Sequence, residues 1–269
     1  MLDRLIEIAA EAGKVILEVY ARADLGVQIK EDGSPVTEAD EAAEAIILEG
    51  LARSFPDIPV VAEEAVAAGR IPPETQRFFL VDPLDGTREF VSRNGEFTVN
   101  IALVEDGQPT AGVVYAPALG TLYAGDASGA RLSRADGAGA FVDWCPIRAG
   151  EAPAEGLKVV ASRSHMSEET RAYLGRFAIA ELISAGSSLK LCKVAAGEAD
   201  LYPRMGRTMA WDIAAGDAVL RAAGGMVRTV DGEPFNYRRS RVPGDTEFAN
   251  PWFVASGSFD PMQYQRSSQ

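Results

Sequence analysis

Histidine and cysteine are nearly absent from this chain of 269 residues, which has one histidine and two cysteines. A metal site built from imidazole or thiolate ligands is therefore excluded, and a Ser-His-Asp hydrolase would depend on His165 alone. Cys145 and Cys192 lie far apart and neither belongs to a CxxC motif. We predict that both are buried free thiols rather than a disulfide.

Positive charge and long apolar runs are also scarce. Asp and Glu outnumber Lys and Arg by 39 to 26, giving a net charge of -13 and a pI near 4.6. This balance argues against a nucleic-acid polymer or a membrane surface as partner, because both are anionic. No apolar run approaches the roughly 18 residues of a membrane span, and the first 20 residues lack a basic start with a cleavable apolar core. We expect a cytoplasmic protein without integral membrane contact.

The apolar pattern of the first half predicts two helices followed by an antiparallel sheet. The helices are expected at residues 2–23 and 37–54, and Thr37 with Asp40 resembles a capping box. The strands are expected at residues 60–61, 78–81, 97–104, 111–115 and 121–124. A stretch rich in Gly, Ala and Pro at residues 135–156 is interpreted as the junction between two lobes, 1–150 and 151–269.

Strands and helices alternate in the second half, which predicts an α/β layer. The expected strands are residues 157–162, 180–184, 199–204, 226–229 and 252–255. The expected helices are residues 167–177, 187–197 and 211–225.

Acidic residues stand at the ends of several expected elements: Asp40, the pair Glu63-Glu64, the pair Asp82/Asp85, and Asp212. Asp40 or Asp212 alone would be read as a helix-start residue, stabilised by unpaired N–H groups and the helix dipole. Of the two adjacent glutamates, Glu64 is the one expected to face water.

The segment "LVDPLDGT" holds Asp82 and Asp85 at the end of a buried strand. Pro83 fixes the backbone and Gly86 allows a sharp turn, so both carboxylates project from one corner. Two like charges that close either share a proton or bind a cation, and oxygen ligands favour a hard ion such as Mg²⁺. A short helical turn from Gly86 and Thr87 would favour an anion. Together these features predict metal-dependent phosphate ester hydrolysis; an aspartate-rich turn in water is the alternative.

These motifs carry a family resemblance. "AEE", "VDPLDGT" and "WDIAAGDAVLRAAGG" resemble the inositol monophosphatase superfamily of Mg²⁺-dependent, lithium-sensitive phosphatases. "SRSH", "GSSLK" and the final "NPWF" are similar to the bacterial CysQ group, the 3′(2′),5′-bisphosphate nucleotidases. Ala62 precedes the glutamate pair in this chain, whereas most relatives have Gly or Ser there. This departure leaves the choice of Glu63 over Glu64 as the metal ligand open.

The resemblance implies a layered α-β-α-β-α sandwich that binds two or three Mg²⁺ ions. The implied metal ligands are Glu63, Asp82, the carbonyl of Leu84, Asp85 and Asp212, with Asp82 bridging two ions. Thr87, paired with Asp40 or Glu63, would orient and deprotonate the attacking water. The N–H groups of Gly86 and Thr87 would bind the phosphate.

The resemblance also implies a small phosphorylated nucleotide as substrate. The implied substrate-binding residues are Glu63, Leu84, Asp85, Gly86, Thr87, Ser162, His165, Ser187, Lys190, Arg204 and Asp212. From the residues alone, His165 could equally cap or pack a helix, and Lys190 and Arg204 could be surface charges.

The reaction implied is hydrolysis of 3′-phosphoadenosine 5′-phosphate (PAP) to AMP and phosphate in sulfate assimilation. An inositol or sugar monophosphatase and a catalytically silent binding module are the alternatives. A monomer or a homodimer is expected, and some relatives are thought to associate peripherally with the inner membrane.

Overall fold

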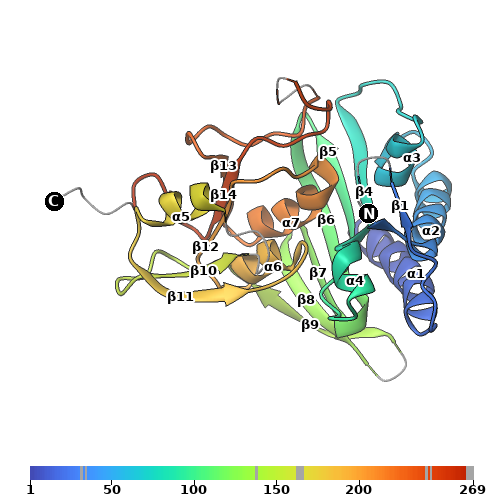
Figure 1. Ribbon diagram of the computed structural model, residues 1–269, viewed down its shortest axis with the longest axis horizontal. Helices are drawn as coiled ribbons and strands as arrows, with labels where there is room; N and C mark the ends of the chain where they lie inside the picture. Colours follow the sequence, from blue (N-terminus) through green and yellow to red (C-terminus); the bar gives the residue numbers. More distant parts are fainter. Residues whose placement is uncertain are drawn as a thin grey trace.

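The computed structural model describes residues 1–30, 33, 35–136, 139–161, 167–239, 242 and 244–264. Five layers follow one another across the molecule (Figure 1). They are a helical pair, a seven-stranded sheet, a second helical pair, a five-stranded sheet and one outer helix. This arrangement is the predicted α-β-α-β-α sandwich.

The first layer is the pair α1 (Leu2–Tyr20) and α2 (Glu38–Ser54), which cover one face of the seven-stranded sheet. Their apolar residues recur at helical spacing and form one core with the sheet. The predicted capping box is present at Thr37, the N-cap of α2. The segment that connects the two helices in sequence contains a two-stranded ribbon of β1 (Gln28–Ile29) and β2 (Pro35–Val36).

The seven-stranded sheet has its strands in sequence order, and every neighbouring pair is antiparallel except β3 and β4. Its strands are β3 (Val60–Ala62), β4 (Arg77–Asp85), β5 (Thr98–Glu105), β6 (Gln108–Ala116), β7 (Thr121–Asp126), β8 (Gly129–Ala135) and β9 (Phe141–Ile147). Short helices occur at α3 (Glu63–Ala67), α4 (Thr87–Val91) and the 3₁₀ turn η1 (Pro117–Leu119).

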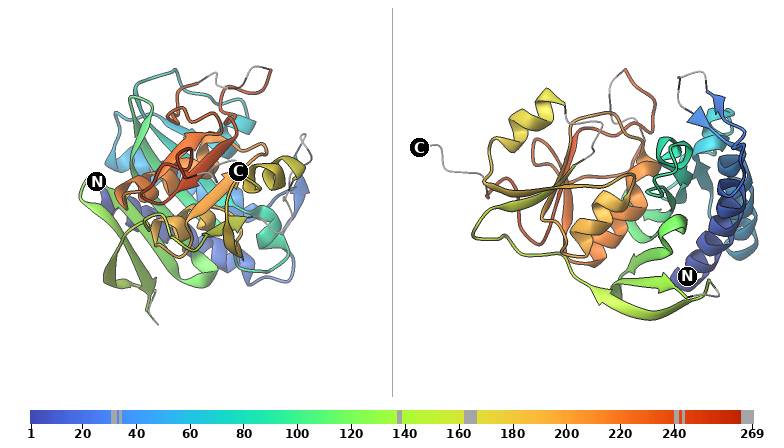
Figure 2. Two further views of the ribbon diagram at one scale, coloured as in Figure 1. Left: turned by 90° about the vertical axis from the view of Figure 1, so that its left-hand side faces the viewer. Right: turned by 60° about the horizontal axis from the view of Figure 1, so that its bottom comes forward.

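The second sheet has the order β11-β10-β12-β14-β13 and mixes parallel with antiparallel pairs. Its strands are β10 (Leu157–Ala161), β11 (Ile179–Ser184), β12 (Leu201–Arg204), β13 (Met226–Thr229) and β14 (Phe253–Ser256). Helices α6 (Leu189–Ala195) and α7 (Ala210–Ala222) lie between the two sheets, and α5 (Glu168–Leu174) lies outside the second one (Figure 2).

Helix α7 approaches the seven-stranded sheet closely because small residues face each other there. A Cβ added at Gly112 of β6 would lie 2.5 Å from the carbonyl oxygen of Ala215. Ala215 and Ala218 are both buried at this contact. Helix α7 also contacts β4 and β5, so its position is fixed relative to the corner at the end of β4.

Two predictions about the region of β9 were wrong. Strand β9 lies inside the stretch interpreted as a junction, and it forms one edge of the seven-stranded sheet. Cys145, on this half-exposed edge strand, is exposed, whereas Cys192 is buried as predicted.

Within the described ranges no helix is long and apolar enough to cross a membrane. The division into lobes at residue 150 stays a prediction.

Candidate metal and phosphate site

The corner at the end of β4 forms as the sequence predicts. The β4–β5 register shifts between Asp82 and Asp85, where Pro83 interrupts the ladder. Gly86 follows with φ of 91°, a left-handed conformation that residues with a Cβ rarely adopt. Asp82 is only 2% exposed, and its Oδ1 accepts a hydrogen bond from the Leu84 N–H at 3.0 Å.

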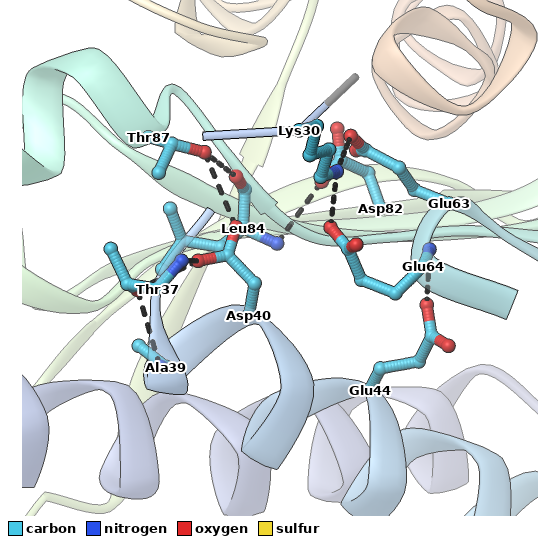
Figure 3. Close-up of polar contacts among 10 residues, drawn as sticks. All are labelled: Lys30, Thr37, Ala39, Asp40, Glu44, Glu63, Glu64, Asp82, Leu84 and Thr87. Carbon is cyan, nitrogen blue, oxygen red and sulfur yellow. Dashed lines mark hydrogen bonds and ion pairs between the residues drawn. The ribbon is translucent and has the colours of Figure 1, made fainter. Parts of the chain in front are cut away.

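Asp40 meets Thr87 at this corner (Figure 3). Asp40 Oδ2 accepts hydrogen bonds from the N–H and the hydroxyl of Thr37 at 2.8 and 2.7 Å. Thr87 Oγ1 lies 3.2 Å from Asp40 Oδ1 and 3.4 Å from the Leu84 carbonyl oxygen. Either oxygen can accept the hydrogen bond that the Thr87 hydroxyl donates. Asp40 therefore caps α2 with one oxygen and faces Thr87 with the other. Burial raises the pKa of Asp40 to about 6.

Glu63 and Glu64 share one cation, Lys30 (Figure 3). Lys30 Nζ lies 2.8 Å from Glu63 Oε1 and 2.6 Å from Glu64 Oε1. Burial disfavours the ammonium, but the two carboxylates outweigh it and raise the pKa of Lys30. The expectation that Glu64 faces water is wrong, because its side chain is 13% exposed against 29% for Glu63.

Glu44 lies behind this pair and is only 3% exposed. Its Oε2 accepts a hydrogen bond from the Glu64 N–H at 2.8 Å. Burial raises the pKa of Glu44 from its ordinary value of 4.5 to about 7. Between these two pH values the unfolded chain holds fewer protons than the folded one, so stability decreases as pH rises.

We expect Glu44→Gln to stabilise the protein at pH 8 and to have little effect near pH 4.5. The shift corresponds to about 3 kcal/mol at about 1.4 kcal/mol per pKa unit. We expect about 1–2 kcal/mol, because one amide oxygen replaces two that face the N–H groups of Glu64 and Ala65. Urea unfolding at both pH values measures the difference. An equal effect at both would contradict the assignment.

Asp212, in the first turn of α7, joins the acids of β4 and α3. Its Oδ2 accepts a hydrogen bond from the Met209 N–H at 2.8 Å. Burial raises the pKa of Asp212 well above its usual range, and the charges of Asp85 and Glu63 raise it further. Burial raises the pKa of Asp82 in the same way, with Glu63, Asp85 and Asp212 adding to it. These acids therefore repel one another within one cluster, in which Asp82 is the most buried member.

The cluster has the donors that a hard divalent ion prefers. Its ligands are carboxylate and carbonyl oxygens, and buried negative charge needs a counter-ion. Among the residues that the structure describes, no three acidic, histidine or cysteine side chains meet closely enough to enclose an ion as they stand. One of the acids, Glu63, is held by its ion pair with Lys30. The donor set fits Mg²⁺ because all of its members are oxygen ligands.

A second wall of the site carries positive charge. A cavity of about 130 Å³ is lined by Asp85, Gly86, Glu89, Ser187, Ser188, Lys190, Leu191, Tyr202, Arg204, Thr208, Asp212 and Ile213. Lys190 is 7% exposed, its Nζ lies 5.6 Å from the centre of the Tyr202 ring, and burial lowers its pKa to about 8. The reading of Lys190 as a surface charge is therefore wrong.

Arg204 borders the same cavity. Its Nη2 donates to the carbonyl of Arg207 at 3.3 Å, while its Nε is buried without a partner in the described structure. Ser187 also lines the cavity. Ser162 and His165 lie outside the described residues, so their predicted roles stay predictions.

Two contributors to the site, Lys30 and Glu44, were not predicted from the sequence, and neither were the contacts of Ser188. Ser188 directly follows Ser187 in "GSSLK", but its partners come from distant segments. Lys30 directly follows the two-residue strand β1, in a segment with no periodic pattern. Glu44 looks like an ordinary surface residue of an amphipathic helix. A local sequence signal for these contacts is lacking because each is formed across the fold.

Comparison with known proteins identifies the family of this chain. The family model described as "Inositol monophosphatase family" matches residues 1–256. The chain is 45% identical over 259 residues to the 3′(2′),5′-bisphosphate nucleotidase CysQ of Escherichia coli O157:H7, covering 95% of this chain and 99% of that protein. The CysQ of Buchnera aphidicola is 41% identical over 266 residues, covering 95% and 93%.

Solved structures show the same relationship. The crystal structure of CysQ from Bacteroides thetaiotaomicron superposes with a TM-score of 0.79 at 37% identity, covering 96% of this chain and 97% of that one. An IMPase of Thermotoga maritima superposes with a TM-score of 0.73 at 28% identity, covering 96% and 92%. This chain therefore belongs to the inositol monophosphatase family, whose enzymes are metal-dependent phosphatases.

Proposed function

We propose that this protein is a Mg²⁺-dependent 3′(2′),5′-bisphosphate nucleotidase that hydrolyses PAP to AMP and phosphate. The observation that carries the proposal is a single site with two oppositely charged walls. Acids lie at the end of β4, and the same cavity is lined by Lys190, which is buried, and by Arg204, which is half-buried. A substrate with one phosphate to be cleaved and a second to be held matches both walls. The name of the CysQ relatives supports the same substrate.

Two or three Mg²⁺ ions are proposed at the acidic wall. The proposed ligands are Glu63, Asp82, the Leu84 carbonyl, Asp85 and Asp212, with Asp82 shared between two ions. Glu63 would exchange its ion pair with Lys30 for the metal. Bound Mg²⁺ lowers the pKa of a coordinated water and neutralises phosphoryl oxygens.

Thr87 and Asp40 are proposed to orient the attacking water. With its proton donated toward Asp40 Oδ1, the Thr87 hydroxyl has lone pairs that can accept a proton from water. Asp40 can receive the Thr87 proton, because its raised pKa of about 6 lies near neutral pH. Glu63 is the alternative partner of Thr87. The N–H groups of Gly86 and Thr87 are proposed to donate to the phosphate.

The second phosphate is proposed to bind Lys190 and Arg204, with Ser187 beside them. A buried N–H without a partner, such as Arg204 Nε, costs about 1–3 kcal/mol of folding free energy. A phosphate oxygen would satisfy that donor and would also face the Lys190 ammonium. The substrate of an inositol monophosphatase has no second phosphate to be held by Lys190 and Arg204. The presence of these two cations therefore favours the bisphosphate substrate. Ser162 and His165 stay proposed members of this pocket.

A substrate panel tests the proposal. Phosphate release is measured with PAP, inositol 1-phosphate and fructose 1,6-bisphosphate, each with Mg²⁺ and again with excess EDTA. We expect PAP to have the highest kcat/KM, and EDTA to stop all hydrolysis. Preference for inositol 1-phosphate would favour a sugar phosphatase, and release that survives EDTA would contradict the metal.

Lys190→Met extends the same measurement to the second phosphate. Methionine keeps the apolar stem against Tyr202 while removing the charge. We expect KM for PAP to rise about tenfold or more, with a much smaller change for 3′-AMP, since one charge-assisted bond contributes about 1.5–3 kcal/mol. Lys158→Met, on β10, is the control for loss of a lysine charge. Equal effects of Lys190→Met on both substrates would remove Lys190 from the pocket.

A further inference from the structure

Two adjacent serines before α6 connect the two segments that carry the acids. Ser187 Oγ donates to the backbone carbonyl of Asp85 at 3.2 Å. Ser188 Oγ donates to the backbone carbonyl of Asp212. One dipeptide therefore holds the end of β4 and the start of α7, which are more than 120 residues apart in sequence.

The serines are themselves held by two residues of β5. Thr98 Oγ1 lies 2.8 Å from Ser187 Oγ, and Asn100 Nδ2 donates to Ser188 Oγ at 2.9 Å. Thr98 and Asn100 are two positions apart on one strand, so their side chains share a face. In the β4–β5 ladder they stand opposite Asp85 and Asp82. Both chains of hydrogen bonds thus start beside the acidic corner.

Hydrogen-bond accounting fixes the direction of the second chain. A serine hydroxyl has one proton, and that of Ser188 goes to the Asp212 carbonyl. The Asn100 amide must therefore present its NH₂ group to Ser188, and its Oδ1 is left buried without a partner in the described structure. Asn100 is 0% and Ser188 3% exposed, so water does not compete for these bonds.

The backbone at Ser187 is also unusual. Its φ is 50°, a left-handed conformation that is rare for a residue with a side chain. Such conformations persist where the surrounding contacts determine them, and they concentrate at functional sites. The hydrogen bonds of the Ser187 hydroxyl with Thr98 and with the Asp85 carbonyl stabilise this conformation.

We propose that Ser187 and Ser188 form a clamp that positions Asp85 and Asp212 for metal binding. Thr98 and Asn100 of β5 hold this clamp in place. It fixes the backbone of both acids, so their carboxylates reach the metal at a set separation although they repel each other. Ser187 thereby acts through its hydroxyl as a positioning residue. The inference rests on the metal ligands proposed above.

Calorimetric titration of the full chain with Mg²⁺ tests the clamp. Loss of outer-shell hydrogen bonds at metal sites typically weakens binding by about 10–100-fold. We expect Ser188→Ala to weaken Mg²⁺ binding about tenfold. Ser256→Ala is the matched control. Ser256 is the last residue of β14, and its buried hydroxyl donates to the Phe259 carbonyl at 2.8 Å. It should lower the melting temperature similarly and leave Mg²⁺ affinity unchanged.

Two further variants separate the clamp from the metal assignment. Thr98→Val keeps side-chain shape, removes the partner of Ser187, and should also weaken Mg²⁺ binding severalfold. If Asp82→Asn loses Mg²⁺ affinity while Ser188→Ala and Thr98→Val retain wild-type affinity, the clamp is refuted. If Asp82→Asn also binds like wild type, the metal assignment fails first and the clamp fails with it.

Discussion

Asp82→Asn is expected to abolish phosphate release, with kcat/KM falling by at least about a thousandfold. The substitution keeps the size of the side chain, and Asn Oδ1 can still accept from the Leu84 N–H. What disappears is the charge at the centre of the acidic cluster, the carboxylate proposed to bridge two ions. Removing it should release at least one Mg²⁺ ion, so the loss appears in kcat and not only in substrate affinity.

Stability separates this loss from a folding defect. In wild type, burial together with the charges of Glu63, Asp85 and Asp212 disfavours ionised Asp82. Removing one of several repelling charges should leave the melting temperature without Mg²⁺ unchanged or higher. Mg²⁺ should then raise the melting temperature of wild type but not of the variant.

The control for this prediction is Asp57→Asn, which changes an exposed turn between α2 and β3. It should retain wild-type turnover and the stabilisation by Mg²⁺. Wild-type activity of Asp82→Asn would contradict the two-metal assignment. Loss of activity with an equal loss of stability in EDTA would instead assign Asp82 a structural role.

The sequence predicted those parts of the site that are determined locally. The corner after β4 depends on Pro83 and Gly86 within one short segment, and the capping box at Thr37 and Asp40 spans four residues. The family resemblance supplied the fold and connected Asp212 to the corner. The proposed metal ligands were therefore predicted from local motifs, and the family resemblance assigned these motifs to one site.

The unpredicted contacts depend on the packing of distant elements. Lys30 reaches Glu63 from a separate ribbon, and Ser188 joins α6, β5 and α7. Strand β9 was missed because Gly, Ala and Pro dominate its surroundings and Pro146 lies within it. An edge strand tolerates proline, because one side of its backbone needs no hydrogen bond from a neighbour.

Thr87→Ala is expected to lower kcat by about 100-fold or more, the usual contribution of a positioned proton-transfer group. The methyl group left behind cannot accept a proton from water or pass one to Asp40. Thr87→Ser is the matched control, since it keeps the hydroxyl and should retain activity within a few fold. Mg²⁺ affinity should be unchanged in both variants, because neither alters a proposed metal ligand side chain.

The pH profile identifies the partner of Thr87. Asp40 can accept the Thr87 proton only when ionised, and burial raises its pKa to about 6. The kcat of wild type should therefore decrease as pH falls through about 6, and the residual activity of Thr87→Ala should lack that decrease. If Thr87→Ala instead keeps the acid limb while Asp40→Asn is fully active, Glu63 becomes the partner that receives the proton.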